Sequence, residues 1–152
     1  MSKKITVIGA GSVGATITYT LSVMGVADEI VMIDINETKV LGEALDIRQG
    51  LPFCGTRSVY AGGYAEAENS DMVIITSGLP RKAGQTRLEL AQVNVDILKG
   101  IMPRITKYAP DAIYLLVANP VDILTYTFVK YSGIPEHRVF GSGTMLDSVR
   151  LR

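Results

Sequence analysis

The chain has 152 residues, of which 47% are hydrophobic and 20% are charged, and its 15 basic and 15 acidic side chains give a formal net charge of zero. This length and composition are typical of one soluble globular domain with a sizeable core. Balanced charge argues against nucleic acid or a membrane surface as the main partner, and no apolar run approaches the roughly 20 residues of a membrane span.

Short β-rich runs alternate with longer helical patterns along the chain. The predicted strands are the runs at residues 5–8, 29–33, 57–62, 71–76, 112–120 and 138–143. Apolar residues at helical spacing predict helices over residues 12–24, 37–48, 86–108 and 121–131, and a further helix begins near residue 144. Strands separated by helical crossovers indicate an α/β fold with an open parallel sheet and helices on both faces. Six strands fit the doubly wound Rossmann arrangement, although other small α/β folds share this rhythm.

The stretch VIGAGSVGATI carries the spacing G-x-G-x-x-G at Gly9, Gly11 and Gly14. It follows the first predicted strand and opens the first predicted helix, where backbone N–H groups and the helix dipole favour an anion. Asp34 ends the second strand, twenty residues after Gly14, where a carboxylate can bind ribose hydroxyls and would repel a 2′-phosphate. The pattern predicts NAD rather than NADP. The alternative is a glycine-rich turn with a helix-capping aspartate.

Three later segments, SGLPRKAGQTRLELAQVN, VANPVDILT and GSGTMLDSVRLR, resemble the lactate/malate dehydrogenase family. The resemblance is colinear from the first strand to the last residue, and it is strongest to the NAD-binding half of a bacterial L-lactate dehydrogenase. Family members are longer, two-domain enzymes. The resemblance therefore implies that residues 1–152 are the NAD-binding domain and that the substrate domain lies outside this chain.

The same resemblance implies an NAD site at the ends of the predicted strands. The implied contacts are with the pyrophosphate for Gly9, Gly11, Val13 and Gly14, with the adenosine side for Asp34, Lys39, Tyr64, Gly78 and Leu79, and with the nicotinamide side for Asn119 and Ser142.

A small 2-keto or 2-hydroxy acid is the implied substrate. Arg87, at the end of a mobile loop, would close over the substrate and polarise its carbonyl, and Asn119 would touch the substrate oxygen. Asp147 would orient a catalytic histidine, and Arg150 would bind the substrate carboxylate. Guanidinium groups suit both the developing negative charge and the planar carboxylate. From the residues alone, Arg87 could be a solvated charge, and Asp147 and Arg150 could form a surface ion pair.

Arg81 bears on the choice of substrate. The family's lactate dehydrogenases usually have glutamine at this position, whereas its malate dehydrogenases have arginine, which would pair with the second carboxylate of oxaloacetate. Residues 50–53 and 141–150 resemble the lactate branch. Pyruvate and lactate are therefore favoured, malate dehydrogenase is the alternative, and Arg81 could also be an ordinary loop charge.

The single histidine, His137, falls on a predicted turn before the last strand, and the resemblance implies that the catalytic imidazole lies beyond this chain. We therefore expect the chain alone to bind NAD weakly and not to turn over pyruvate. The alternatives are a stand-alone NAD-binding module and a piece that needs a complementary chain. Arg152 matches a position that helps to bind fructose 1,6-bisphosphate in allosteric bacterial lactate dehydrogenases.

The remaining expectations concern assembly and location. The resemblance implies a homo-oligomer, with a tetramer for the full-length enzyme. The single cysteine, Cys54, excludes an internal disulfide and has no metal-ligand spacing around it, so no metal site is predicted. A reducing, cytoplasmic location is the default.

Overall fold

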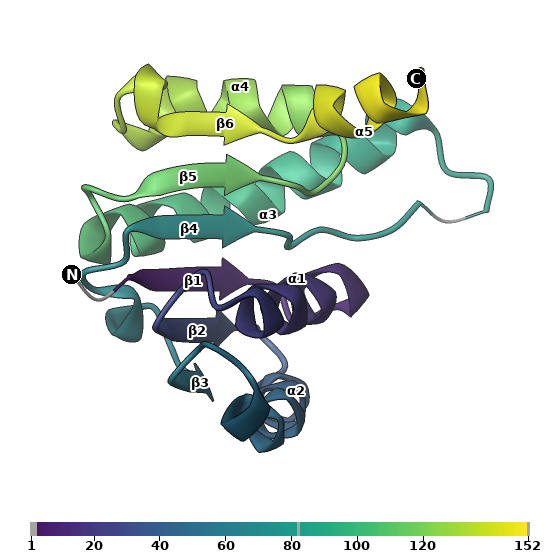
Figure 1. Cartoon of the computed structure of the whole chain (residues 1–152). Coiled ribbons are helices and arrows are strands. Elements are labelled where there is room, and N and C mark those ends of the chain that lie inside the picture. The colour runs from purple at the N-terminus through teal and green to yellow at the C-terminus, as the bar shows by residue number, and fades with distance from the viewer. Residues whose placement is uncertain (1–2, 82, 152) are drawn as a thin grey trace.

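The computed structural model describes residues 3–81 and 83–151, without the side chains of residues 146 and 147. Strands and helices alternate along the chain (Figure 1). The strands are β1 (Lys4–Ile8), β2 (Glu29–Ile33), β3 (Ser58–Ala61), β4 (Met72–Ile75), β5 (Ile113–Leu116) and β6 (Val139–Gly141). The helices are α1 (Ser12–Met24), α2 (Glu37–Gln49), α3 (Arg87–Tyr108), α4 (Val121–Ser132) and α5 (Gly143–Arg150). Three 3₁₀ turns, at Leu51–Phe53, Ala65–Ala67 and Glu136–Arg138, were not predicted.

The six strands form one parallel sheet in the order β3-β2-β1-β4-β5-β6. The order reverses beside β1, where Ile8 pairs with Ile33 of β2 on one side and with Ile75 of β4 on the other. This is the doubly wound Rossmann order, so the predicted fold class is confirmed. Because every strand runs the same way, all carboxyl ends meet at one edge of the sheet, which is where ligands bind in such folds.

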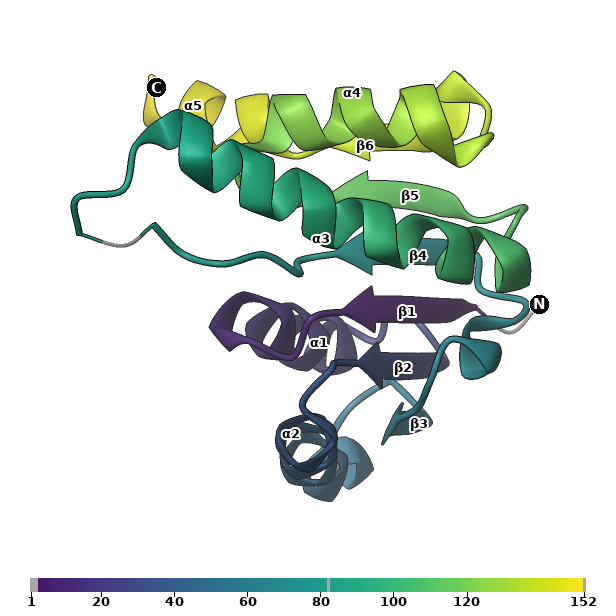
Figure 2. The same ribbon diagram turned by 180° about the vertical axis from the view of Figure 1, so that it is seen from behind.

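Apolar clusters cover both faces of the sheet, which explains why the strands are continuous apolar runs. On one face, α3 and α4 pack on residues such as Ile75 and Tyr114, whose ring lies 4.7 Å from that of Phe128. On the other face, α1 and α2 pack on residues such as Val7 and Ile30, which are fully buried. Figure 2 shows α3 crossing its face of the sheet.

One half of the second face is open. In Figure 1, α1 and α2 lie over β1, β2 and β3, whereas no helix of the described chain lies over β4, β5 and β6 on that side. Ile113 and Phe140 point to this open half, since they share a face with Leu115, and they are 39% and 50% exposed. We call these two residues and Leu115 the open face.

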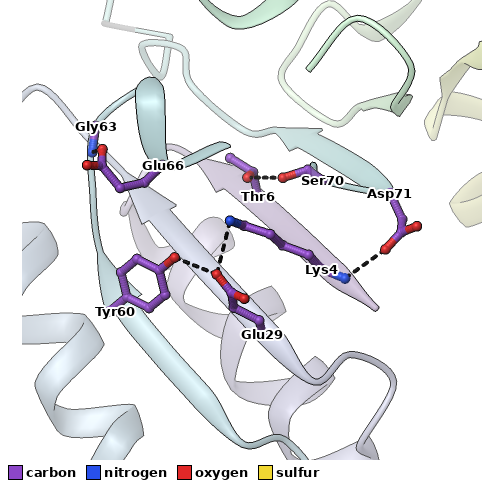
Figure 3. Close-up of polar contacts among 8 residues, drawn as sticks. All are labelled: Lys4, Thr6, Glu29, Tyr60, Gly63, Glu66, Ser70 and Asp71. Carbon is purple, nitrogen blue, oxygen red and sulfur yellow. Dashed lines mark hydrogen bonds and ion pairs between the residues drawn. The ribbon is translucent and has the colours of Figure 1, made fainter. Parts of the chain in front are cut away.

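A polar network joins β1, β2 and β3 (Figure 3). The Glu29 carboxylate accepts a hydrogen bond from the Tyr60 hydroxyl (2.5 Å) and forms an ion pair with Lys4 (3.0 Å). The Tyr60 bond is the main reason why the pKa of Glu29 lies below its usual value, with Lys4 contributing and burial opposing. Burial, followed by Glu29, raises the pKa of Tyr60. Thr6 and Ser70 share a buried hydroxyl–hydroxyl bond of 2.7 Å between β1 and the turn before β4. The network fixes neighbouring strands relative to one another, and its Lys4 and Glu29 lie at the amino ends of β1 and β2.

Within the described residues, no helix combines the length and the apolar character needed to cross a bilayer.

Candidate functional site

The glycine loop, residues 9–14, joins β1 to α1 in a conformation that needs two of its glycines. Gly9 has φ of +105°, which side chains rarely tolerate, and its N–H donates to the Ile33 carbonyl (2.7 Å). A Cβ at Gly14 would lie 1.8 Å from the Gly9 carbonyl oxygen, so the first turn of α1 packs directly on the loop. The start of α1 therefore packs closely against the end of β1.

Gly11 leaves open space in front of the helix. It is the N-cap of α1, yet no side chain caps this helix and its first turn has no acidic residue. A Cβ at Gly11 would meet no atom within 4 Å. By contrast, Asn36 caps α2 and Thr86 caps α3. The first-turn N–H groups of α1 therefore lack a side-chain acceptor, and with the helix dipole they suit an anionic ligand.

Asp34 follows β2 and holds the glycine loop as well as facing the site. Its carboxylate accepts hydrogen bonds from the N–H of Ala10 (2.6 Å) and from that of Asn36 (2.9 Å). The residue is half-buried, and a carboxylate has further lone pairs for ligand hydroxyls. The sequence indicated a ligand contact here, but not the bond to Ala10.

Thr76 is a further part of this site that sequence reasoning missed. It follows β4, and its hydroxyl is shared between the carbonyls of Ile8 (3.1 Å) and Gly9 (3.0 Å). The threonine therefore ties the glycine loop to the neighbouring strand. A hydroxyl residue at the end of the apolar run DMVIIT is the one signal that the sequence offers.

Tyr64 and Lys39, two of the residues predicted for the adenosine side, belong to the segments that follow β3 and β2. Tyr64 follows β3 and packs against the core under α3, with the Arg104 guanidinium 5.8 Å from its ring centre. Burial raises the pKa of Tyr64, the Arg104 charge opposes this, and the nearby Asp34 charge adds to it. Lys39 is exposed in the first turn of α2, and Val13 is exposed beside the glycine loop.

The other predicted cofactor residues follow the remaining strands at the same edge. Gly78 and Leu79 come after β4, the exposed Asn119 comes after β5, and Ser142 comes after β6, with its N–H donating to the Leu116 carbonyl (3.0 Å). Asn94 of α3, which was not predicted, bonds to the main chain of both Leu79 and Asn119. Each of the six strands thus delivers at least one predicted residue to a single edge.

The substrate-side arginines come from three separate segments. Arg81 is exposed in the loop between β4 and α3, and its Nε donates to the Gln85 carbonyl (2.8 Å). Arg87 is the exposed first residue of α3, and Arg150 is the exposed last residue of α5. Figure 1 shows this loop and α5 at the end of the molecule toward which the strands point. The side chain of Asp147, and Arg152 altogether, lie outside the described residues.

His137 lies on the opposite edge. It belongs to the 3₁₀ turn Glu136–Arg138, immediately before the amino end of β6, and it is exposed. The glycine loop follows the carboxyl end of β1, so the sheet separates the imidazole from the site.

The chain is similar to known dehydrogenases over nearly its whole length. A family model described as the lactate/malate dehydrogenase NAD-binding domain matches residues 3–141. An L-lactate dehydrogenase of Clostridium botulinum (strain Hall) is 51% identical over 149 residues, which are 98% of this chain and 47% of the relative. One of Thermoanaerobacter sp. (strain X514) is 52% identical, over 98% of this chain and 48% of the relative. The chain spans about half the length of the curated relatives it matches.

Solved structures are similar over the same half. A minor L-lactate dehydrogenase of Enterococcus mundtii superposes with a TM-score of 0.92 at 42% identity, over 96% of this chain and 47% of that one. A malate dehydrogenase of Picrophilus torridus gives a TM-score of 0.87 at 38% identity, over 93% of this chain and 46% of that one.

Proposed function

The chain belongs to the lactate/malate dehydrogenase family, as its NAD-binding domain, and from this premise we propose that it supplies the cofactor half of an NAD-dependent L-2-hydroxyacid dehydrogenase. The observation that carries the proposal is the uncapped start of α1 beside Gly11, where open space, free first-turn donors and the Asp34 carboxylate meet.

The residues present fit a dinucleotide. The pyrophosphate would lie against the backbone of Gly9, Gly11, Val13 and Gly14, and the adenosine ribose would bind Asp34. A phosphate on that ribose would meet the carboxylate, so NAD is favoured over NADP. Lys39 and Tyr64 would border the adenosine, and Asn119 and Ser142 the nicotinamide. When bound, the nicotinamide supplies the hydride.

The substrate side is proposed from the arginines and Asn119. Reduction of a 2-keto acid builds negative charge on its carbonyl oxygen, which the Arg87 guanidinium and the Asn119 amide would stabilise. Arg150 would pair with the planar carboxylate. Arg87 is a poor match to the positive end of a helix dipole, which supports a role beyond the helix itself. Asp147 would orient the proton-donating imidazole.

We favour pyruvate and lactate as the substrate pair. The relatives named above as L-lactate dehydrogenases are more similar to the chain than the malate dehydrogenase structure. Arg81 keeps oxaloacetate and malate as the second candidate, because a second cation in the loop suits a second carboxylate. We also propose that the full-length protein is a cytoplasmic homo-oligomer.

The chain by itself should not turn over pyruvate, because its single histidine lies at the amino edge of the sheet. Steady-state assay of the purified 152-residue chain with NADH and pyruvate tests this, and robust turnover would contradict it. Mixing the chain with a separately expressed second half of a relative tests the split-enzyme alternative. Regained activity would support that alternative.

Titration of the chain with NADH and NADPH, followed by nicotinamide fluorescence, tests the cofactor proposal. We expect NADH to bind more tightly than NADPH, and Asp34→Asn to weaken NADH by about tenfold, since a charged acceptor and a loop contact are lost. Glu37→Gln, on the exposed start of α2, removes a nearby charge without touching the loop and should leave NADH binding within about twofold. Equal affinity of the wild type for NADH and NADPH would contradict the proposal that Asp34 binds the adenosine ribose.

A further inference from the structure

Asn94 is a polar side chain on the apolar face of a helix. The other buried residues of α3 are Ala91, Leu98, Ile101, Met102 and Ile105, which follow the helical repeat toward the core. Asn94 occupies the same stripe and is 1% exposed. A buried carboxamide is costly unless its donors and acceptor are all bonded, so its partners reveal what it is there to hold.

Those partners are the main chains of two loops. The Asn94 Oδ1 accepts from the Leu79 N–H (2.8 Å), and its Nδ2 donates to the Leu79 carbonyl (3.2 Å) and to the Asn119 carbonyl (2.7 Å). Both amide protons and the oxygen are therefore used. The arrangement needs two donors and one acceptor on one short side chain, which among the uncharged side chains of this length only asparagine provides.

The loop main chain at Gly78 also lies close to the amide. A Cβ at Gly78 would lie 3.3 Å from the Asn94 nitrogen and 3.3 Å from the Ala118 Cβ. A side chain at Gly78 would therefore crowd both Asn94 and Ala118, so the main chain after β4 lies close to the carboxamide. Leu79 lies near the start of the loop that carries Arg81 and ends at Arg87.

We propose that Asn94 is a positioning residue. It clamps the start of the arginine loop, which follows β4, carries Arg81 and ends at Arg87, to the main chain at Asn119 after β5. This inference rests on the proposed function, in which Asn94 holds the nicotinamide-side half of the site in register with the loop that closes over the substrate. On the adenosine side, Asn94 bonds to Leu79, whereas the glycine loop is held independently of Asn94 by Asp34 and Thr76.

The first test needs no variant. Amide hydrogen exchange of the free wild-type chain, with each rate divided by the intrinsic rate of that residue type, should show the Leu79 N–H protected at least about tenfold more than the N–H of Gly84 in the same loop. Equal protection at these two positions would overturn the clamp. This measurement needs no cofactor, so it tests the clamp even if NADH does not bind and the proposed function fails.

The second test separates positioning from folding. Asn94→Asp replaces the donating nitrogen by a buried carboxylate, and at pH 7.5 we expect NADH to bind about tenfold more weakly. ADP-ribose should weaken less, by no more than about threefold, because it shares the Leu79 contact but also binds the glycine loop and Asp34, which Asn94 does not touch. Burial should raise the pKa of the new carboxyl, and its protonated form again has a donor. At pH 5 the NADH defect should therefore shrink to about threefold, whereas Asn94→Leu should show the same defect at both pH values.

Gln92→Glu is the matched control, since it makes the same change of amide to acid on the exposed side of α3. It should leave both ligands within about twofold of the wild type. Equal weakening of NADH and ADP-ribose by Asn94→Asp, or no weakening of either, would refute the proposal. Thermal unfolding of each variant identifies one that has failed to fold, and in that case the exchange test decides.

Discussion

Two loops follow adjacent strands at the centre of the sheet, and they are held in different ways. The glycine loop after β1 is bonded at Gly9 and Ala10, to Ile33, Asp34 and Thr76, and is packed against Gly14 of α1. The loop after β4 is fastened at its ends, to Asn94 at Leu79 and through the Thr86–Glu89 capping box at the start of α3. Between these ends, Arg81 bonds to Gln85 of the same loop.

The difference matches two kinds of ligand. A tightly held loop suits a ligand whose shape is constant, whereas a loop held only at its ends suits a substrate that enters and leaves. In the proposed function, the first loop would bind the pyrophosphate and the second would close over the substrate.

Gly14→Ala should break the fixed loop and have the largest effect. The new Cβ would overlap the Gly9 carbonyl, so we expect a loss of about 3 kcal/mol in the free energy of unfolding and loss of measurable NADH binding. Urea unfolding and NADH titration measure the two effects. Gly42→Ala is the control, because a Cβ at this helical glycine of α2 meets nothing within 4 Å, and it should stabilise the chain by about 0.5–1 kcal/mol. Similar destabilisation by both substitutions would contradict the steric argument.

Arg81→Gln probes the loop after β4. The side chain is exposed, so the free energy of unfolding should change by less than about 0.5 kcal/mol. In an enzyme reconstituted by fusing the chain to the second half of a lactate dehydrogenase relative, the activity ratio of oxaloacetate to pyruvate should fall about tenfold, as one ion pair is lost. If that ratio does not move, Arg81 does not determine specificity.

Tyr60→Phe perturbs the sheet at the edge remote from both loops and should have the smallest effect. The pKa of Glu29 is lowered by its Tyr60 bond, so this bond stabilises the fold above the unfolded pKa near 4.5 and is lost as the pH falls through the folded pKa. The variant should be less stable by about 1 kcal/mol at pH 7, and the deficit should shrink below pH 4.5. Urea unfolding as a function of pH checks this, with Tyr126→Phe, an exposed tyrosine of α4, as the control. If the stability deficit of Tyr60→Phe grows as the pH falls, the Tyr60 bond does not lower the pKa of Glu29.

The sequence predicted the larger features well, because they rest on local pattern. Continuous apolar runs and helical spacing located all six strands and all five helices, and G-x-G-x-x-G with Asp34 located the loop at the edge. The three 3₁₀ turns were missed, since three-residue elements are too short to show a periodic pattern.

Thr76 and Asn94 were missed for a different reason. Their partners lie far along the chain, at separations of 67 and 68 residues for Thr76 and of 15 and 25 for Asn94. Nothing in the neighbouring residues specifies these pairings, which exist only once β1, β4 and β5 lie side by side. A polar residue on an apolar helical stripe, as in AQVNVDIL, is the usable signal, and it indicates that a partner exists without saying which.

The open face has a consequence for how the chain behaves in solution. Ile113, Leu115 and Phe140 present apolar surface at the uncovered half of the sheet, and the 15 basic and 15 acidic residues cancel near neutral pH. Without net charge there is little electrostatic repulsion between molecules to oppose contact through that surface. The colloidal stability of the isolated chain should therefore be poorest around neutrality and should improve when the solution is made mildly alkaline, so that purification and assay of the chain depend on the pH of the buffer as much as on its temperature.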